Sequence, residues 1–90
     1  MTRKRKFYQT HLNIFQTVND NDSYYLYKLK NSENIRNGEF PWEFVRRYSS
    51  KEDLFDELMN RLSVSSIEIL SKYEVDEKLI NTRINLYRNH

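Results

Sequence analysis

The chain has no cysteine and no alanine, and it has one glycine and one proline among its 90 residues. Without cysteine there can be no disulfide and no thiolate metal site, which fits a reducing cytoplasm. A single glycine excludes the glycine-rich loops that hold phosphates in nucleotide enzymes. No apolar run approaches the roughly 20 residues needed to cross a bilayer, and no apolar stretch typical of a signal peptide follows Lys6. We therefore expect one soluble, cytoplasmic domain, 1–90.

Catalytic groups are equally scarce. His11 and His90 are the only histidines, and His11 has no neighbouring partner for acid–base or metal chemistry. The acidic run 52–57 falls on the outer side of an amphipathic helical pattern, where a solvated surface is the ordinary role. The sequence thus predicts no catalytic residue, no metal ligand and no cofactor. We expect a protein that is not an enzyme and that acts by binding another macromolecule.

Charge is segregated along the chain although the net charge is only +2. Segment 1–18 holds four bases and no acid, whereas 50–80 holds eight acids against four bases. The four bases are consecutive, at 3–6, and we predict that 1–6 is a flexible basic arm. This separation favours two surfaces with different partners.

The first half predicts a small antiparallel sheet. Alternating apolar residues and a tyrosine-rich run predict a hairpin, 5–18 with 23–31, around the turn-forming cluster 19–22. A helix over 7–18 is the alternative, because Tyr8, Leu12, Phe15 and Val18 also fit the helical period. A third strand follows at 42–48, and Pro41 predicts that it lies at an edge of the sheet.

The second half predicts helices. Leu54, Leu58 and Leu62 form part of a stripe that predicts a helix over 51–62. Ser65 and Glu68 resemble a capping box for a helix at about 66–73, and Asp76 is expected to cap a third helix. A strand over 67–75 is the competing interpretation, because apolar residues also alternate there. We predict an α+β fold, with the sheet from 7–48 packed by two or three helices from 50–88, and an all-α bundle as the alternative.

Aromatic residues provide the first set of candidate binding residues. Seven tyrosines, five phenylalanines and one tryptophan exceed what a 90-residue core can easily bury. Tyrosine, tryptophan and arginine dominate the energetics of protein interfaces, and an edge strand offers unpaired backbone groups to a partner. The predicted partner-binding residues are Trp42, Arg46, Arg47, Tyr48, Tyr25 and Tyr27.

Basic residues provide the second set, for nucleic acid. Segment 66–88, with the helix 51–62 before it, loosely resembles the helix-turn-helix of DNA-binding and transposase-like proteins. That resemblance implies that Leu70 and Val75 pack inside and that residues of the last helix read a groove. The basic arm would add phosphate contacts. The predicted nucleic-acid-binding residues are Arg3, Lys4, Arg5, Lys6, Lys78, Asn81, Thr82 and Arg83.

The amino-acid composition indicates the kind of genome that encodes the protein. The chain is rich in asparagine, lysine and tyrosine and lacks alanine, which indicates an A/T-rich gene. In this it resembles the small accessory proteins of phages and mobile elements, including counter-defence proteins similar to anti-CRISPR inhibitors. The resemblance implies an inhibitor that occupies the surface of a host protein or protein–nucleic-acid complex, with no membrane partner. A DNA- or RNA-binding regulator is the alternative.

Overall fold

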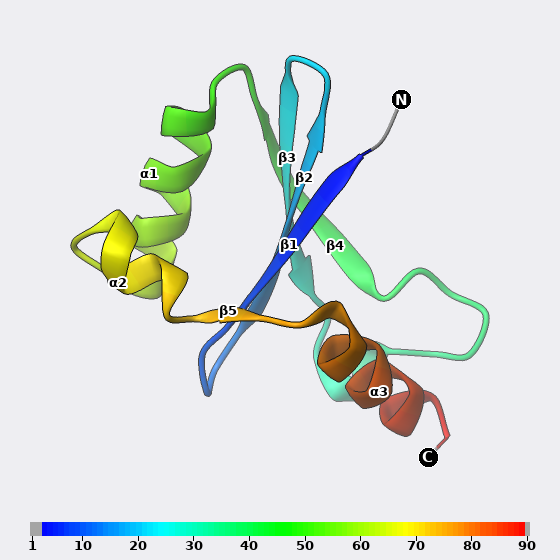
Figure 1. Cartoon of the computed structure of the whole chain (residues 1–90). Helices are drawn as coiled ribbons and strands as arrows, with labels where there is room; N and C mark the ends of the chain where they lie inside the picture. The colour runs from blue at the N-terminus through cyan, green and yellow to red at the C-terminus, as the bar shows by residue number, and fades with distance from the viewer. Residues whose placement is uncertain (1–2, 90) are drawn as a thin grey trace.

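The computed structural model describes residues 3–89 and folds as a twisted sheet flanked by helices (Figure 1). In chain order the elements are β1 (Lys4–Gln9), β2 (Ile14–Asp20), β3 (Ser23–Leu29), a short 3₁₀ helix (Ser32–Asn34), β4 (Trp42–Tyr48), α1 (Lys51–Leu62), α2 (Ile67–Ser71), β5 (Glu74–Val75) and α3 (Glu77–Arg88). The strands form one antiparallel sheet in the order β4-β3-β2-β1-β5. The α+β prediction is confirmed, and the all-α alternative is wrong.

The predicted first strand is in fact two strands. The chain turns at Thr10–Asn13, where the Thr10 amide donates to the Asn13 carbonyl at 2.9 Å and the Thr10 hydroxyl accepts from the Asn13 amide at 3.1 Å. Leu12, which the alternation counted as a strand residue, is 76% exposed in this turn. The second turn is at Asn21-Asp22, inside the predicted cluster, and Asn21 has a φ of 60°. The hairpin is therefore a three-stranded meander.

The basic segment is not a free arm. Lys4, Arg5 and Lys6 form the first half of β1, where they pair with residues 17–19 of β2. Side chains alternate across a strand, so Arg5 projects on the opposite side of the sheet from Lys4 and Lys6. Met1 and Thr2, the rest of the predicted arm before Arg3, lie outside the described residues.

The helices begin at serine and aspartate caps. α1 has the predicted bounds, and the Ser50 hydroxyl accepts from the Asp53 amide at 3.2 Å. α2 starts one residue later than the predicted capping box: its cap is Ser66, whose hydroxyl accepts from the Ile69 amide at 3.3 Å. Asp76 caps α3 through the Lys78 amide, as predicted. Each cap satisfies an amide that the first helical turn leaves without a partner.

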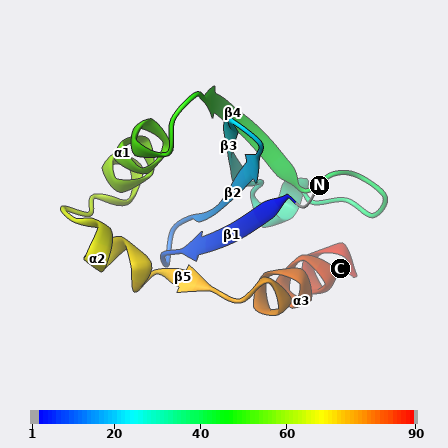
Figure 2. The same cartoon turned by 45° about the horizontal axis from the view of Figure 1, so that its top comes forward.

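Segment 66–88 does not form a helix-turn-helix. β5 interrupts it and pairs with Phe7 and Tyr8 of β1, so α2 and α3 end up on opposite sides of the sheet (Figure 2). Leu70 packs with α1 on one side, whereas Val75 packs with α3 residues on the other. The strand alternative for 67–75 is correct only for its last two residues. The two residues of β5, at the edge of the sheet, occupy the position where a helix-turn-helix would have its turn.

The two sides of the sheet are covered to different extents. The side under α1 and α2, which we call the closed face, buries Tyr8, Phe15, Leu26, Leu54, Leu58 and Leu70. The other side, which we call the half-open face, is covered by α3 and the 3₁₀ segment, and it buries Phe7, Ile14, Leu29, Ile35, Trp42, Ile80 and Ile84. Within 3–89, no helix is long and apolar enough to cross a membrane.

Candidate binding surface on the half-open face

The register of the sheet arranges the half-open face as three rows that run across the strands. The core row, which lies near α3, consists of Trp42, Leu29 and Ile14. Next to it is the ring row, Phe44, Tyr27, Gln16 and Phe7. The outermost is the basic row, Arg47, Tyr25, Val18 and Arg5. The core row is buried, whereas the other two rows mix buried residues with exposed ones, and their exposed members are Phe44, Arg47 and Arg5.

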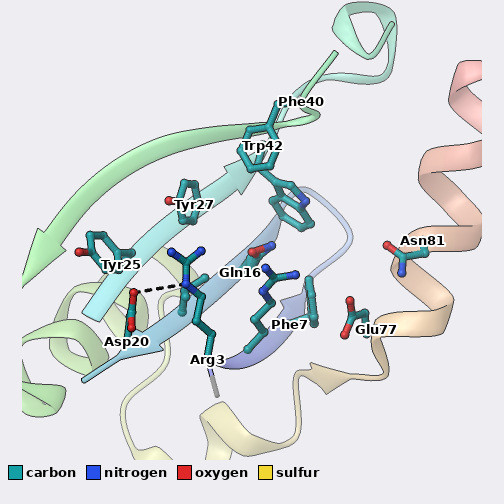
Figure 3. A pocket seen from close by; sticks show the side chains of 12 residues that line it. Arg3, Phe7, Gln16, Asp20, Tyr25, Tyr27, Phe40, Trp42, Glu77 and Asn81 are labelled. Atoms are coloured by element: carbon teal, nitrogen blue, oxygen red, sulfur yellow. Dashed lines mark ion pairs between the residues drawn. The ribbon is translucent and has the colours of Figure 1, made fainter. Parts of the chain in front are cut away.

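A hollow of about 240 Å³ opens over the ring and basic rows (Figure 3). Tyr25, Tyr27 and Phe40 line one side of it, and Glu77 and Asn81 of α3 face them from the other side. The hollow is therefore bounded by rings on the sheet side and by polar groups on the helix side.

An aromatic cluster lies on the β3–β4 side of the half-open face, where Tyr27 and Phe40 line the hollow and Phe44 stands outside its lining. Tyr27 stands edge-on to Phe44, with ring centroids 5.7 Å apart, and to Phe40, with centroids 6.1 Å apart. Such edge-to-face pairs are favourable arrangements for aromatic side chains. Phe44 is nevertheless 55% exposed and Phe40 62% exposed. The cluster is thus ordered by its own contacts while much of two rings remains in contact with solvent.

Arginines mark both ends of the basic row. Arg47 of β4 donates to the Ser23 hydroxyl at 2.8 and 3.1 Å, which fixes its side chain against the sheet. Arg5 stands three strands away on β1, and neither arginine forms an ion pair within residues 3–89. Arg3 adds a third guanidinium and pairs with Asp20 at 3.3 Å. The positive charge of Arg5 and Arg47 is available to an anionic partner.

The floor of the hollow carries an amide. Gln16 lies in the middle of the ring row, and only 6% of its surface is exposed. Its side chain lines the hollow between Phe7 and Tyr27. An amide can donate and accept hydrogen bonds at once, so it offers a polar contact where the neighbouring groups are rings.

The structure divides the predicted partner-binding set. Tyr25, Tyr27 and Arg47 come together on the half-open face. Trp42 is only 8% exposed and lies against Phe7, with centroids 5.7 Å apart, because α3 covers this end of the face, and it also lines the hollow. Arg46 pairs opposite the closed-face residue Leu26. Tyr48 packs toward the closed face as well, and its hydroxyl is buried.

The predicted nucleic-acid-binding set is divided in the same way. Arg3, Arg5 and Asn81 line the hollow. Lys4 and Lys6 line a second hollow on the closed face, together with Lys51. The other three residues of the set do not join either group. Lys78 and Thr82 are exposed on α3, where the Thr82 hydroxyl donates to the Lys78 carbonyl, and Arg83 is half-buried and lines a separate hollow near the β1–β2 turn.

Sequence reasoning missed Phe40, Phe44 and Gln16. Phe44 has the same strand parity as Trp42, which was a signal that both rings lie on one face. Pattern alone could not show that a helix covers one ring and leaves the other. Gln16 is polar and breaks the apolar alternation of its strand, but it lies on the same face as Ile14 and Val18 and forms the floor of the site.

The edge position of β4 is confirmed, but the edge carries features that block strand addition. Pro41 precedes the strand, a bulge interrupts its pairing opposite Leu26 and Tyr27, and Arg46 and Arg47 follow one another there. Proline, bulges and charges are the devices by which natural sheets protect their edges. The face of the sheet is therefore the better docking surface.

No protein-family model, curated protein or solved structure matches this chain. Within 3–89, no three histidine, aspartate or glutamate residues gather in a way that could hold a metal ion.

Burial raises the pKa of the Tyr8 phenol to about 12, and the Glu74 carboxylate contributes in the same direction. The Tyr8 phenol is therefore neutral near pH 7 and forms part of the core on the closed face.

Proposed function

We propose that the protein is a non-catalytic binding protein that docks onto another macromolecule through the ring and basic rows of the half-open face. One observation carries this proposal: Phe40 and Phe44 leave more than half of their surface exposed on the face that also carries Arg5 and Arg47, two arginines that form no ion pair within residues 3–89. Exposed rings that lie close together on one side of a small domain mark an interaction surface. Arginine and tyrosine are the residues that anchor such contacts.

An inhibitor that acts by occupying a surface needs no catalytic group. This role agrees with the phage-accessory character of the sequence and with a face that is ordered before binding. Tyr27 is held between two rings and Arg47 is held by Ser23, so binding would cost little additional side-chain entropy. Preorganised groups of this kind favour a specific docking role over a solubilising one.

A nucleic-acid-binding regulator is the second candidate, and the basic half of β1 favours it. Arg5 projects onto the half-open face and Lys4 and Lys6 onto the closed face, so this end of the sheet presents cations on both sides. Phosphates are the common target of such clusters. The helix-turn-helix route to the same function is closed, because α2 and α3 do not pack together.

Site-specific photo-cross-linking tests the proposal whatever the class of partner. A benzophenone amino acid would replace Tyr25, in the basic row, or Asp56, on the exposed side of α1, in cells that produce the protein. We expect a discrete adduct from position 25 and none from position 56. Equal adducts from both positions, or adducts from position 56 alone, would show that the half-open face is not the docking surface.

A further inference from the structure

We infer that the partner of the half-open face is a single-stranded nucleic acid. The inference rests on the proposed function and specifies its ligand. The strand crosses the sheet from β4 to β1, roughly perpendicular to the β-strands, with phosphates along the basic row and bases against the ring row. The groups that carry it are the rings of Phe40, Tyr27 and Phe44 and the guanidiniums of Arg5 and Arg47.

The positions of the cations favour a chain of phosphates. Arg47 and Arg5 are the two ends of one cross-strand row, joined through the register pairs Tyr25–Arg47, Val18–Tyr25 and Arg5–Val18. Three strand spacings separate them, which is about 14 Å. An extended polyanion can contact both ends, whereas a single small anion can contact only one.

The rings favour unpaired bases. Single-stranded segments expose base faces that stack on aromatic side chains, whereas a duplex keeps those faces inside its stack. Phe40 and Phe44 are both tilted steeply against Tyr27, at 81° and 64°, and more than half of each ring is exposed. The Gln16 amide beneath them can hydrogen-bond to a base edge.

The carboxylates around the hollow fix the orientation of the strand. Asp20 is already paired with Arg3 at 3.3 Å, which offsets its repulsion of a phosphate. Glu77 lies on α3, across the hollow from the rings. Phosphates are therefore repelled by the helix side and attracted to the basic row, while base amino groups can face Glu77. The carboxylates of an acidic protein could also pair with the arginines, but they would not stack on the exposed rings as unpaired bases do.

A fluorescence anisotropy titration with a labelled oligothymidylate of about 12 nucleotides tests the inference, since single-strand modules cover roughly 4–16 nucleotides. Phe44→Leu keeps an apolar side chain and removes the ring, and we expect binding on the order of ten-fold weaker. Leu79→Ala, on the exposed side of α3, is the matched control and should not change affinity. A duplex of the same length should bind more weakly than the single strand.

Salt dependence tests the phosphate contacts separately. Arg5→Gln should reduce the slope of log affinity against log salt by about 0.7 for a single strand. Arg36→Gln, an exposed arginine in the loop before β4, is the control and should leave the slope unchanged. Circular dichroism of each variant confirms that the fold is retained.

Three results would overturn the inference. The first is absence of binding to the oligonucleotide, the second is equal affinity for single strand and duplex, and the third is unchanged affinity in both Phe44→Leu and Phe40→Leu. If a cross-linker at position 25 then still captured a protein, the docking role of the face would stand and only its ligand would be wrong. If position 25 gave no adduct and the oligonucleotide did not bind, both proposals would fail.

Discussion

Trp42 and Phe44 lie two residues apart on the same strand and the same face, yet one is 8% exposed and the other 55%. The difference comes from α3, whose Ile80 and Ile84 pack with Trp42 and with Phe7 at one end of the ring row but leave Phe44 at its other end exposed. On the closed face α1 and α2 bury Leu26 and Leu58 completely, and the hollow on that face is lined by Lys4, Lys6 and Lys51. Helix placement, more than strand composition, therefore decides which aromatic residues of this sheet become core and which become surface.

The open part of the sheet is notable in such a short chain. A 90-residue domain buries a modest share of its surface, and every exposed ring forgoes hydrophobic stabilisation of roughly 1.5–3 kcal/mol. α3 carries Leu79 and Leu86 on its outer side, where they are 63% and 61% exposed and do not cover the rings of the half-open face. The docking role proposed above would account for the uncovered rings.

The largest expected effect lies on the closed face. Leu58→Ala should lower the free energy of unfolding by about 3–5 kcal/mol, because a completely buried leucine leaves a cavity that the well-packed helix cannot fill. Urea denaturation followed by circular dichroism measures the change. A loss below about 1 kcal/mol would mean that α1 does not pack as closely as the structure indicates.

A neighbouring pair on α3 sharpens the comparison between the faces. Ile80 is 1% exposed and Leu79 is 63% exposed, although the two residues are adjacent on the helix. Ile80→Ala should cost about 2–4 kcal/mol, whereas Leu79→Ala should change stability by less than about 0.5 kcal/mol. The same urea experiment compares them. Equal costs would contradict the placement of α3 against the sheet.

The pH dependence of the free energy of unfolding tests the burial of Tyr8 on the closed face. Burial raises the pKa of Tyr8 from 10.0 in the unfolded chain to about 12 in the fold, so the folded state keeps the proton longer. Stability from this group is complete below pH 10 and is lost as the pH rises toward 12, by roughly 2–3 kcal/mol at most. Tyr8→Phe should remove that part of the decline in alkaline urea titrations. An unchanged decline would place the phenol in water.

How far the sequence predicts the fold depends on whether the signal is local. The bounds of α1 and the caps at Ser50 and Asp76 follow from neighbouring residues, and all three are confirmed. The turn at Thr10–Asn13 was missed because it has neither glycine nor proline and depends on a threonine hydroxyl. β5 could not be predicted, since two residues join the sheet only because β1 is beside them.

Several residues of the candidate site could be predicted from the sequence, but their arrangement on one face of the sheet could not. Arg5, Tyr25, Tyr27 and Arg47 were all among the predicted binding residues, but they were assigned to two different partners. Their union depends on the register of four strands, which places Arg5 and Arg47 in one row. Nothing near Trp42 in the sequence indicates that α3, more than 30 residues later, would bury most of this side chain.

A small effect on stability is expected from a substitution in the ring row. Phe44→Ser removes a ring that is 55% exposed and that contacts Tyr27 edge-on. We expect a loss of less than about 1 kcal/mol, since the aromatic pair contributes about 0.5–1.5 kcal/mol and serine relieves exposed apolar surface. Ile80→Ala, on the covered part of the same face, provides the contrast. A cost near that of Ile80→Ala would make Phe44 a core residue, and the argument that this ring is left open for a ligand would lose its basis.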